Sequence, residues 1–258
     1  MQITIRPVAT YAEYRACEQL QQLVWGDEFV VPLNLLVTAQ RNGGLVLGAF
    51  ADDELVGFVF GLLARTADGR LKHASHMAAV RPDLRDARIG ERLKRAQREF
   101  VLAQDIELMT WTYDPLLARN AHLNIRKLGA ICRTYMRNVY GPEPELINGI
   151  LPSDRFQVEW WLVQSPIARP PADQVATAPL INPSLDAPPA ISREPVARLR
   201  IPLDFDAVQQ HDPQAAQAWR YHIRACAEAA FAAGYVVVDF GRADSQYGEY
   251  TLVRPNVS

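Results

Sequence analysis

The sequence predicts an α/β protein of the α+β type, with a mixed, mostly antiparallel central sheet that contains one parallel strand pair. Two apolar runs, residues 45–51 and 54–64, are joined by a pair of aspartates and followed by a further strand over 71–80, as in antiparallel hairpins. Residues 71–128 then show the order strand, helix, strand, helix, which implies a parallel pair joined by a right-handed crossover. A β-α-β-β pattern over residues 196–258 predicts a C-terminal extension that pairs with the main sheet or packs beside it.

The N-terminal region predicts a short strand over residues 2–6 and an amphipathic helix behind it. Thr10 and Glu13 have the spacing of a capping box, in which each side chain accepts a hydrogen bond from a free amide at the helix start. From Tyr14 to Val24 the apolar residues recur at helical spacing, so this helix buries one face.

Length and composition are those of an ordinary globular chain. Of the 258 residues, 49% are hydrophobic and 22% are charged, and this balance excludes wholesale disorder. A formal net charge of −2 gives no reason to expect nucleic acid or an anionic membrane as a partner. There is no apolar run as long as a membrane span and no signal-peptide core at the N-terminus.

The three cysteines are far apart in the sequence and odd in number, which fits reduced thiols better than a disulfide framework. The histidines and cysteines also lack ligand spacing, so no metal site is expected. We therefore expect a cytoplasmic protein. The oligomeric state stays open, with a homodimer among the alternatives.

The second half of the chain divides at a proline-rich segment. Residues 166–195 contain eight prolines and show no periodicity, which predicts a long irregular connection. We expect a core domain over 1–165, this connection over 166–195, and an extension over 196–258 that packs on the core. In the extension, Asp212 suits a helix N-cap and Pro213 the first helical position.

The segment 80–93 joins a predicted strand to a predicted helix through a basic loop. The first amides of a helix are unpaired and lie at the positive end of its dipole, so they form an anion site suited to a pyrophosphate. Arg85, Arg88 and Arg92 add positive charge there, and Gly90 has no Cβ to obstruct a phosphate. A basic first turn is also typical of a solvated helix face, so this loop alone does not decide between the two interpretations.

The same segment resembles the pyrophosphate-binding signature of the GNAT superfamily of acyl-CoA-dependent N-acyltransferases. That signature has a valine, a proline and then Arg/Gln-x-x-Gly-x-Gly/Ala. Six residues of this chain are in register with it: Val80, Pro82, Arg85, Ile89, Gly90 and Leu93. The departure is Arg88, which stands where the first glycine of the signature normally lies, and it either weakens the amide cradle or adds a guanidinium for the phosphates.

A second segment, residues 118–129, resembles the helix that follows in GNAT proteins, Asn-x-x-Ala-x-x-x-Tyr-x-Lys-Leu-Gly. The matching residues are Ala121, Lys127, Leu128 and Gly129. Ala118 stands at the asparagine position, with Asn120 close by, and Ile125 stands at the tyrosine position. The resemblance to the superfamily core covers roughly residues 1–140, and flanking segments resemble a bacterial subgroup with C-terminal extensions.

The resemblance implies an acyl-CoA, acetyl-CoA or another, as co-substrate, bound where the parallel strand pair splays apart. It implies that backbone groups of residues 77–80 pair with the pantetheine arm and orient the thioester carbonyl. The residues expected to bind the co-substrate are Met77, Ala78, Ala79, Val80, Arg85, Asp86, Arg88, Ile89, Gly90, Glu91, Asn120 and Asn124.

For catalysis we expect His76 as the general base, because an unperturbed imidazole accepts a proton near neutral pH. A histidine satisfied by backbone or water on an inner strand is an equally open interpretation. Strand alternation puts Val80, Ala78 and His76 on one face and His73, Ser75 and Met77 on the other, unless a β-bulge inverts the order upstream of it. With Ile125 at the usual tyrosine position, the expected general acid is Tyr135, with Tyr140 or no dedicated acid as alternatives.

The acyl acceptor is expected at and beyond the end of the strand that adjoins the cofactor strand, where ligands of parallel strands commonly bind. The residues that cluster there are Trp111, Tyr113, Asp114 and Arg119. Arg119 or Arg155 can hold a carboxylate bidentately, which suits an amino-acid acceptor, although either also fits a loop-anchoring arginine.

These features favour an N-acyltransferase that moves an acetyl or succinyl group from a CoA thioester to the amine of a small metabolite, by direct attack of the amine. An amino acid is the first acceptor to test, by family analogy alone. The alternative is a non-catalytic acyl-CoA-binding or regulatory protein, which the departures at Arg88 and Ile125 motivate. A protein-modifying acetyltransferase is a third hypothesis, to which the nearly neutral charge gives little support.

Overall fold

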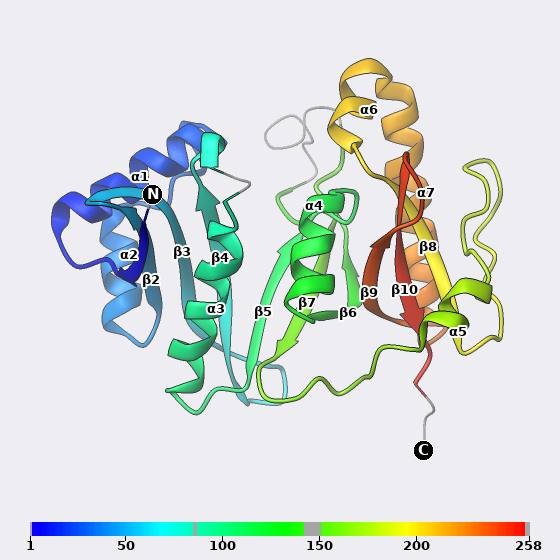
Figure 1. Cartoon of the computed structure of the whole chain (residues 1–258), viewed down its shortest axis with the longest axis horizontal. Helices are drawn as coiled ribbons and strands as arrows, with labels where there is room; N and C mark the ends of the chain where they lie inside the picture. Colours follow the sequence, from blue (N-terminus) through cyan, green and yellow to red (C-terminus); the bar gives the residue numbers. More distant parts are fainter. Residues whose placement is uncertain (1, 85–86, 142–150, 256–258) are drawn as a thin grey trace. The chain divides into compact units, whose positions relative to one another are not determined.

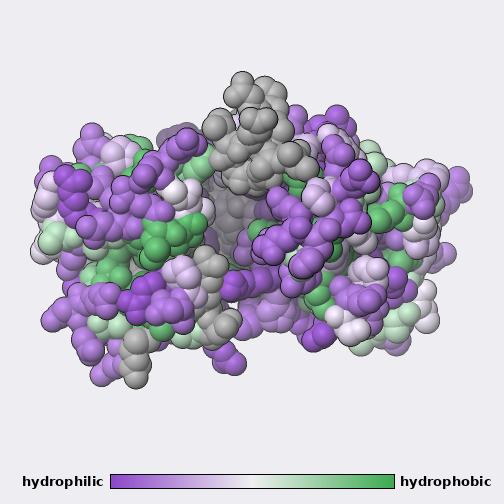
Figure 2. Space-filling view, turned by 90° about the horizontal axis from the view of Figure 1, so that it is seen from above, coloured by the Kyte–Doolittle hydropathy of each residue, from purple (hydrophilic) through white to green (hydrophobic). Residues whose placement is uncertain are grey.

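The computed structural model describes residues 2–84, 87–141 and 151–255. The chain forms two compact units. The first comprises Met1–Trp111 with Trp161–Val163, and the second Thr112–Trp160 with Gln164–Ser258. In the view of Figure 2, hydrophilic side chains cover most of the surface of each unit, with apolar patches between them, as on most folded proteins.

The strands of the first unit follow one another in space in the order β1-β2-β3-β4-β5 (Figure 1). β1 to β4 pair antiparallel, and β4 pairs parallel with β5. The strands are β1 (Ile3–Pro7), β2 (Leu45–Ala51), β3 (Glu54–Arg65), β4 (Leu71–Val80) and β5 (Leu108–Tyr113). The predicted mixed, mostly antiparallel sheet with one parallel pair is therefore confirmed.

Helices cover both faces of this part of the sheet. They are α1 (Tyr11–Trp25), α2 (Leu33–Arg41) and α3 (Ile89–Leu102), with short 3-10 turns η1 (Asp27–Phe29) and η2 (Pro82–Leu84). One core cluster joins Cys17 of α1 and Leu36 of α2 to Phe60 of β3. A second joins Leu93 of α3 to Val59 of β3, so α3 packs on the opposite face.

Local signals predicted the start of α1 correctly. Thr10 and Glu13 form the predicted capping box: the Glu13 amide donates to Thr10 Oγ1, and the Thr10 amide donates to the Glu13 carboxylate. The helix α2 is not among the predicted elements, and its N-cap Pro32 makes no side-chain capping bond.

In the second unit the strands lie in the order β7-β6-β9-β10-β8, and neighbours pair antiparallel. These strands are β6 (Ile131–Met136), β7 (Arg155–Trp161), β8 (Val196–Pro202), β9 (Val236–Arg242) and β10 (Tyr247–Val253). The helices are α4 (Ala118–Ala121), a π-helical turn η3 (His122–Lys127), α5 (Ala172–Thr177), α6 (Phe205–His211) and α7 (Pro213–Ala232). The predicted β-α-β-β extension is present as β8, α7, β9 and β10, with the unpredicted α6 before α7.

Two details of this unit correct the sequence analysis. The segment 166–195 is not wholly irregular: it includes α5, and Asn182 exchanges hydrogen bonds with the backbone of Arg200 on β8. The helix predicted before Gly129 is α-helical for only its first turn and then widens into η3. Gly129, with φ of 74°, follows it in the left-handed conformation that commonly ends a helix.

Among the described residues, no helix combines the length and apolar character that crossing a bilayer requires. The cytoplasmic location and the domain boundaries at residues 165 and 195 stay predictions.

Candidate functional site

The start of α3 forms an open helix N-terminus directly after β4 and η2. Its N-cap residue, Arg88, makes no side-chain capping bond, and the first backbone bond of the helix runs from the Arg92 amide to the Arg88 carbonyl. Within the described part of the chain, the amides of Ile89 and Gly90 have no hydrogen-bond partner. Such amides, at the positive end of the helix dipole, form an anion site.

Arg88, which stands where the resemblance places a glycine, has a backbone conformation that suits glycine. Its φ of 57° and ψ of 19° lie in the left-handed region, which glycine adopts without strain. Arg88 also places an exposed, positively charged side chain at the first turn of α3.

The other charged residues of this turn are distributed differently. Arg85 and Asp86 lie outside the described residues. Glu91 forms an ion pair with Arg95, and Arg92 donates to the carbonyl of Ile3 at 2.7 Å, so its guanidinium is anchored on β1.

β4 and β5 pair only at their beginnings. The register pairs His73 with Met109 and Ala74 with Thr110, and the described residues show no further pairing between the two strands. Residues 77–80 of β4 pair with β3 on one side, and the described residues show no strand pairing on their other edge, beyond the fork where β4 and β5 part. An open strand edge offers backbone donors and acceptors to an extended ligand.

A β-bulge at His76 changes the predicted face assignment. Phe60 of β3 pairs with Met77 and Gly61 pairs with Ser75, which leaves His76 as the extra residue. The imidazole of His76 packs edge-on against Phe60, 5.8 Å between ring centroids, on the face that α1 and α2 cover. His76 and Val80 are thus on opposite faces, and the assignment to one face was wrong for the reason foreseen, an inversion upstream of a bulge.

His76 itself is solvent-exposed, and desolvation by the surrounding protein lowers its pKa. A lowered pKa keeps the imidazole neutral near pH 7, which is the form that accepts a proton.

The opposite face holds a buried polar chain that sequence reasoning missed. Lys94 Nζ donates to Ser75 Oγ at 2.6 Å, and Ser75 Oγ donates to Gln97 Oε1 at 3.0 Å. Gln97 Nε2 lies 3.0 Å from His73 Nε2. Lys94 lies on α3 and, despite its charge, is only 4% exposed.

In the second unit, Tyr135 and Asp114 are both tied to charged partners. Tyr135 donates to Asp154 at 2.7 Å, and burial, followed by the Asp154 charge, raises the pKa of its phenol. Asp114 receives two hydrogen bonds from Arg220, at 2.9 and 2.5 Å.

The remaining predicted site residues of the second unit differ in exposure. Tyr113 is buried, and its hydroxyl donates to Tyr250 at 3.2 Å. Arg119 is exposed, Asn120 is half-buried and Asn124 is buried. His76 and Tyr135, the predicted base and acid, belong to different units, and Trp111 is the last residue of the first.

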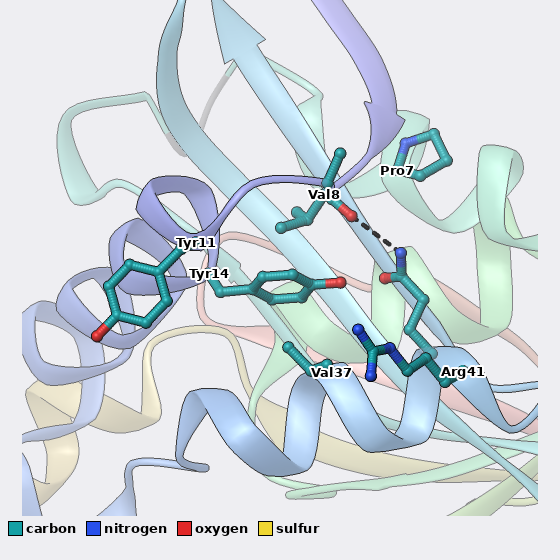
Figure 3. Close-up of a pocket in the computed structure, with 8 residues that line it drawn as sticks. Pro7, Val8, Tyr11, Tyr14, Val37 and Arg41 are labelled. Atoms are coloured by element: carbon teal, nitrogen blue, oxygen red, sulfur yellow. Dashed lines mark hydrogen bonds between the residues drawn. The ribbon is translucent and has the colours of Figure 1, made fainter.

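A shallow pocket of about 510 Å³ also opens in the first unit, between the end of β1, α1 and α2 (Figure 3). Its lining residues are Pro7, Val8, Ala9, Tyr11, Tyr14, Val37, Gln40 and Arg41. Gln40 holds its wall by donating to the Val8 carbonyl at 2.9 Å. None of the predicted site residues lines it.

No protein-family model matches the sequence, and a comparison with curated proteins finds no match either. Solved structures do match. A ribosomal-protein-alanine N-acetyltransferase from Brucella melitensis is 20% identical, with a TM-score of 0.51, over 61% of this chain and 99% of its own. An aminoglycoside 6'-acetyltransferase type Ii is 17% identical, with a TM-score of 0.50, over 63% and 99%. The protein yncA from Salmonella typhimurium, solved with its cofactor acetyl-CoA, is 18% identical, with a TM-score of 0.50, over 66% and 98%.

The chain has the GNAT fold. The matches cover nearly the whole of each of these three chains, so this chain contains a full GNAT fold together with further residues. Ile125 is fully buried in η3. Because it is an isoleucine, the position at which the resemblance places a tyrosine has no hydroxyl.

Proposed function

We propose that this protein is an N-acyltransferase that moves an acyl group, acetyl or succinyl, from a CoA thioester to the amine of a small metabolite. The observation that carries the proposal is the open N-terminus of α3, placed directly after an unpaired edge of β4 in a GNAT fold. The first offers amides and the Arg88 guanidinium to a pyrophosphate, and the second offers backbone groups to a pantetheine arm.

Two similar proteins support the choice of substrates. The yncA structure holds acetyl-CoA, and the aminoglycoside 6'-acetyltransferase is named for a small amine-bearing acceptor. We extend both features to this chain: the co-substrate is an acyl-CoA, and the acceptor is a small molecule.

The proposed reaction is a direct attack of the amine on the thioester. The amine nitrogen forms a bond to the thioester carbon, the carbon–sulfur bond breaks, and the amine loses a proton while the thiolate gains one. His76 takes the amine proton, since its lowered pKa keeps the imidazole neutral.

Tyr135 is the proposed donor of the proton to sulfur. Its raised pKa keeps the phenol protonated, and in this step the proton that Tyr135 donates to Asp154 leaves that hydrogen bond for the sulfur. Departure of the thiolate without a dedicated acid remains the alternative for this step.

Direct attack also fits the state of the cysteines. Cys17, Cys132 and Cys226 are all buried, and burial raises the pKa of each, that of Cys17 and Cys226 to about 12. A buried thiol that keeps its proton is a poor nucleophile, so an acyl-cysteine intermediate on these residues is disfavoured.

For the acceptor we retain Trp111, Tyr113, Asp114 and Arg119. Of these, Arg119 is the exposed cation, so it is the proposed partner of a carboxylate on an amino-acid acceptor. Asp114 already has a buried partner in Arg220, so its proposed part is to hold the loop before α4 in place.

A second candidate function, a non-catalytic acyl-CoA-binding protein, rests on Ile125. Its apolar, buried side chain removes the hydroxyl that the resemblance places near the leaving sulfur. This candidate predicts binding of CoA esters with no acyl transfer.

Thermal unfolding with and without CoA, acetyl-CoA and succinyl-CoA tests the proposal. A ligand that binds only the folded protein raises the melting temperature. The substitution Gly90→Trp fills the proposed phosphate site and should abolish the rise. Gly241→Trp is the matched control, since Gly241 on β9 has open space around it.

A rise that is lost only in Gly90→Trp supports the site. No rise with any CoA species at millimolar concentration contradicts it. Turnover of an amine panel then separates the two candidates: we expect His76→Ala to lower kcat by about 10²–10⁴-fold in an enzyme, whereas a binding protein shows no turnover at all.

A further inference from the structure

A buried lysine, Lys94, lies where β4 and β5 part, at the fork. Lys94 reaches up from α3, and its Nζ lies 2.6 Å from Ser75 Oγ and 3.9 Å from the ring centroid of Trp111. Ser75 directly follows the last residue of β4 that pairs with β5. Trp111 directly follows the last residue of β5 that pairs with β4. The ammonium group therefore bridges the two strands at the point where they part.

The described residues around Lys94 do not supply a negative charge that matches its own. In the part of the chain that the structure describes, Lys94 forms no ion pair, and its contacts are a serine hydroxyl and an indole face. Its titratable neighbour along the polar chain is His73, whose pKa is lowered to about 4 by burial and then by Lys94, so His73 is neutral.

Burial is costly for such a cation. Desolvation lowers the pKa of Lys94 to about 7. A buried charge is ordinarily paired, and removing its counter-ion is strongly unfavourable. An anion that arrived with a ligand would supply the missing counter-charge.

The proposed acyl-CoA, lying along β4, has its acyl end close to Lys94. With phosphates at the start of α3 and the pantetheine arm along β4 from Val80 to Met77, the acyl group extends toward Ser75. An acetyl group ends at its methyl carbon, whereas a succinyl or glutaryl chain continues past that carbon and ends in a carboxylate, so only the longer chains carry a negative charge toward the ammonium group.

We infer that Lys94 determines the acyl donor by binding a carboxylate at the far end of the acyl group, so that the preferred donor is a CoA thioester of a dicarboxylic acid. This inference rests on the proposed function. Ser75 and Trp111 position the ammonium group, and Lys94 contacts the substrate without taking part in the proton transfers.

Binding of CoA, acetyl-CoA and succinyl-CoA to the full chain, measured by titration calorimetry, tests the inference. We expect succinyl-CoA to bind at least about tenfold more tightly than acetyl-CoA, because a charge-assisted pair forms in a desolvated place. In Lys94→Met, which removes the charge but keeps an unbranched apolar side chain, this preference should disappear while CoA still binds. Lys72→Met is the matched control, a half-buried lysine on β4 that should keep the preference.

A second readout follows from proton linkage. At pH 8 a carboxylate beside Lys94 favours the ammonium form, so succinyl-CoA binding should take up protons, seen as a dependence of the binding enthalpy on the buffer. Acetyl-CoA binding should show no uptake from this group.

Equal affinity for the two esters in the native protein, or a preference that survives in Lys94→Met, would overturn the inference and leave the proposed function intact. Absence of binding by CoA itself would instead contradict the proposed function.

Discussion

The backbone of Arg88 lowers the stability of the fold, whereas its side chain is proposed to strengthen the binding of CoA. Its left-handed conformation costs a residue with a Cβ about 1 kcal/mol or more, and glycine would avoid that cost. Backbone strain of this kind persists where the surrounding structure imposes it and is common at functional sites. We interpret the guanidinium beside the open amides as the functional gain that offsets the strain.

The substitution Arg88→Gly should therefore raise the free energy of unfolding by about 0.5–1 kcal/mol and weaken CoA binding. Denaturant unfolding and calorimetric titration measure the two effects. Asp105→Gly is the control, because Asp105 has the same φ of 57° but lies after the other end of α3. It should not change CoA affinity. Unchanged affinity in Arg88→Gly would exclude a contribution of the guanidinium.

Lys94 makes stability depend on pH in an unusual direction. Below about pH 7 Lys94 is protonated in the folded protein and in the unfolded chain, so burial of its charge lowers the free energy of unfolding in full. Between pH 7 and about 10.4, the pKa of a lysine in an unfolded chain, only the unfolded chain binds the proton. The free energy of unfolding therefore rises with pH over this range.

Comparison of the native protein with Lys94→Met isolates this effect, since the buried cysteines and tyrosines contribute equally to both. We expect the variant to be more stable at pH 6.5 and to lose that advantage toward pH 10, by at most about 1.4 kcal/mol per pH unit. Unfolding in urea over this range measures the difference. A difference that is independent of pH would show that Lys94 titrates normally in the folded protein.

At the scale of elements, the pairing of β3 with β4 organises the site. The bulge at His76 puts the proposed base on the α1–α2 face and leaves His73 and Ser75 on the α3 face with Lys94. Strand alternation predicts both strands and their lengths, but it assumes an unbroken period of two. The extra residue arises from pairing with a distant strand, so no local pattern marks it.

Gly61 of β3 provides the space for this arrangement. A Cβ at Gly61 would overlap the imidazole of His73 and lie 2.9 Å from Gln97 Nε2. We expect Gly61→Ala to lower the free energy of unfolding by about 1–3 kcal/mol, because it overpacks a buried polar chain. Thermal unfolding measures it.

Gly241→Ala is the matched control, a strand glycine with nothing within 4 Å of its added Cβ. It should change stability by less than about 0.5 kcal/mol. Equal effects of the two substitutions would mean that His73 moves away at little cost.

At the scale of the whole molecule, the C-terminal residues belong to the same compact unit as residues 112–160. The Arg220 side chain, 1% exposed on α7, pairs with Asp114, and Tyr250 of β10 donates to the Pro115 carbonyl at 2.7 Å. Apolar contacts follow the same pattern, since Phe156 of β7 packs against Phe231 of α7.

A fragment of residues 1–165, the predicted core domain, should therefore not fold cooperatively. It loses the partner of buried Asp114, and removing one member of a buried ion pair costs about 3–5 kcal/mol, before the loss of the apolar contacts. Circular dichroism melting of the fragment beside the full chain measures this. A cooperative transition in the fragment would show instead that the extension is dispensable.

The sequence by itself determined most strands, the capped helices and the helix N-terminus that forms the proposed anion site. These features depend on residues a few positions apart, such as the Thr10–Glu13 box or the apolar run of β2, so local physical chemistry is enough to predict them. Tertiary structure decided the bulge at His76, the burial of Lys94 and the pairing of Asp114 with Arg220. Each depends on which distant segment packs against the residue. That packing is set by the free energy of the whole folded chain, so a short stretch of sequence does not reveal it.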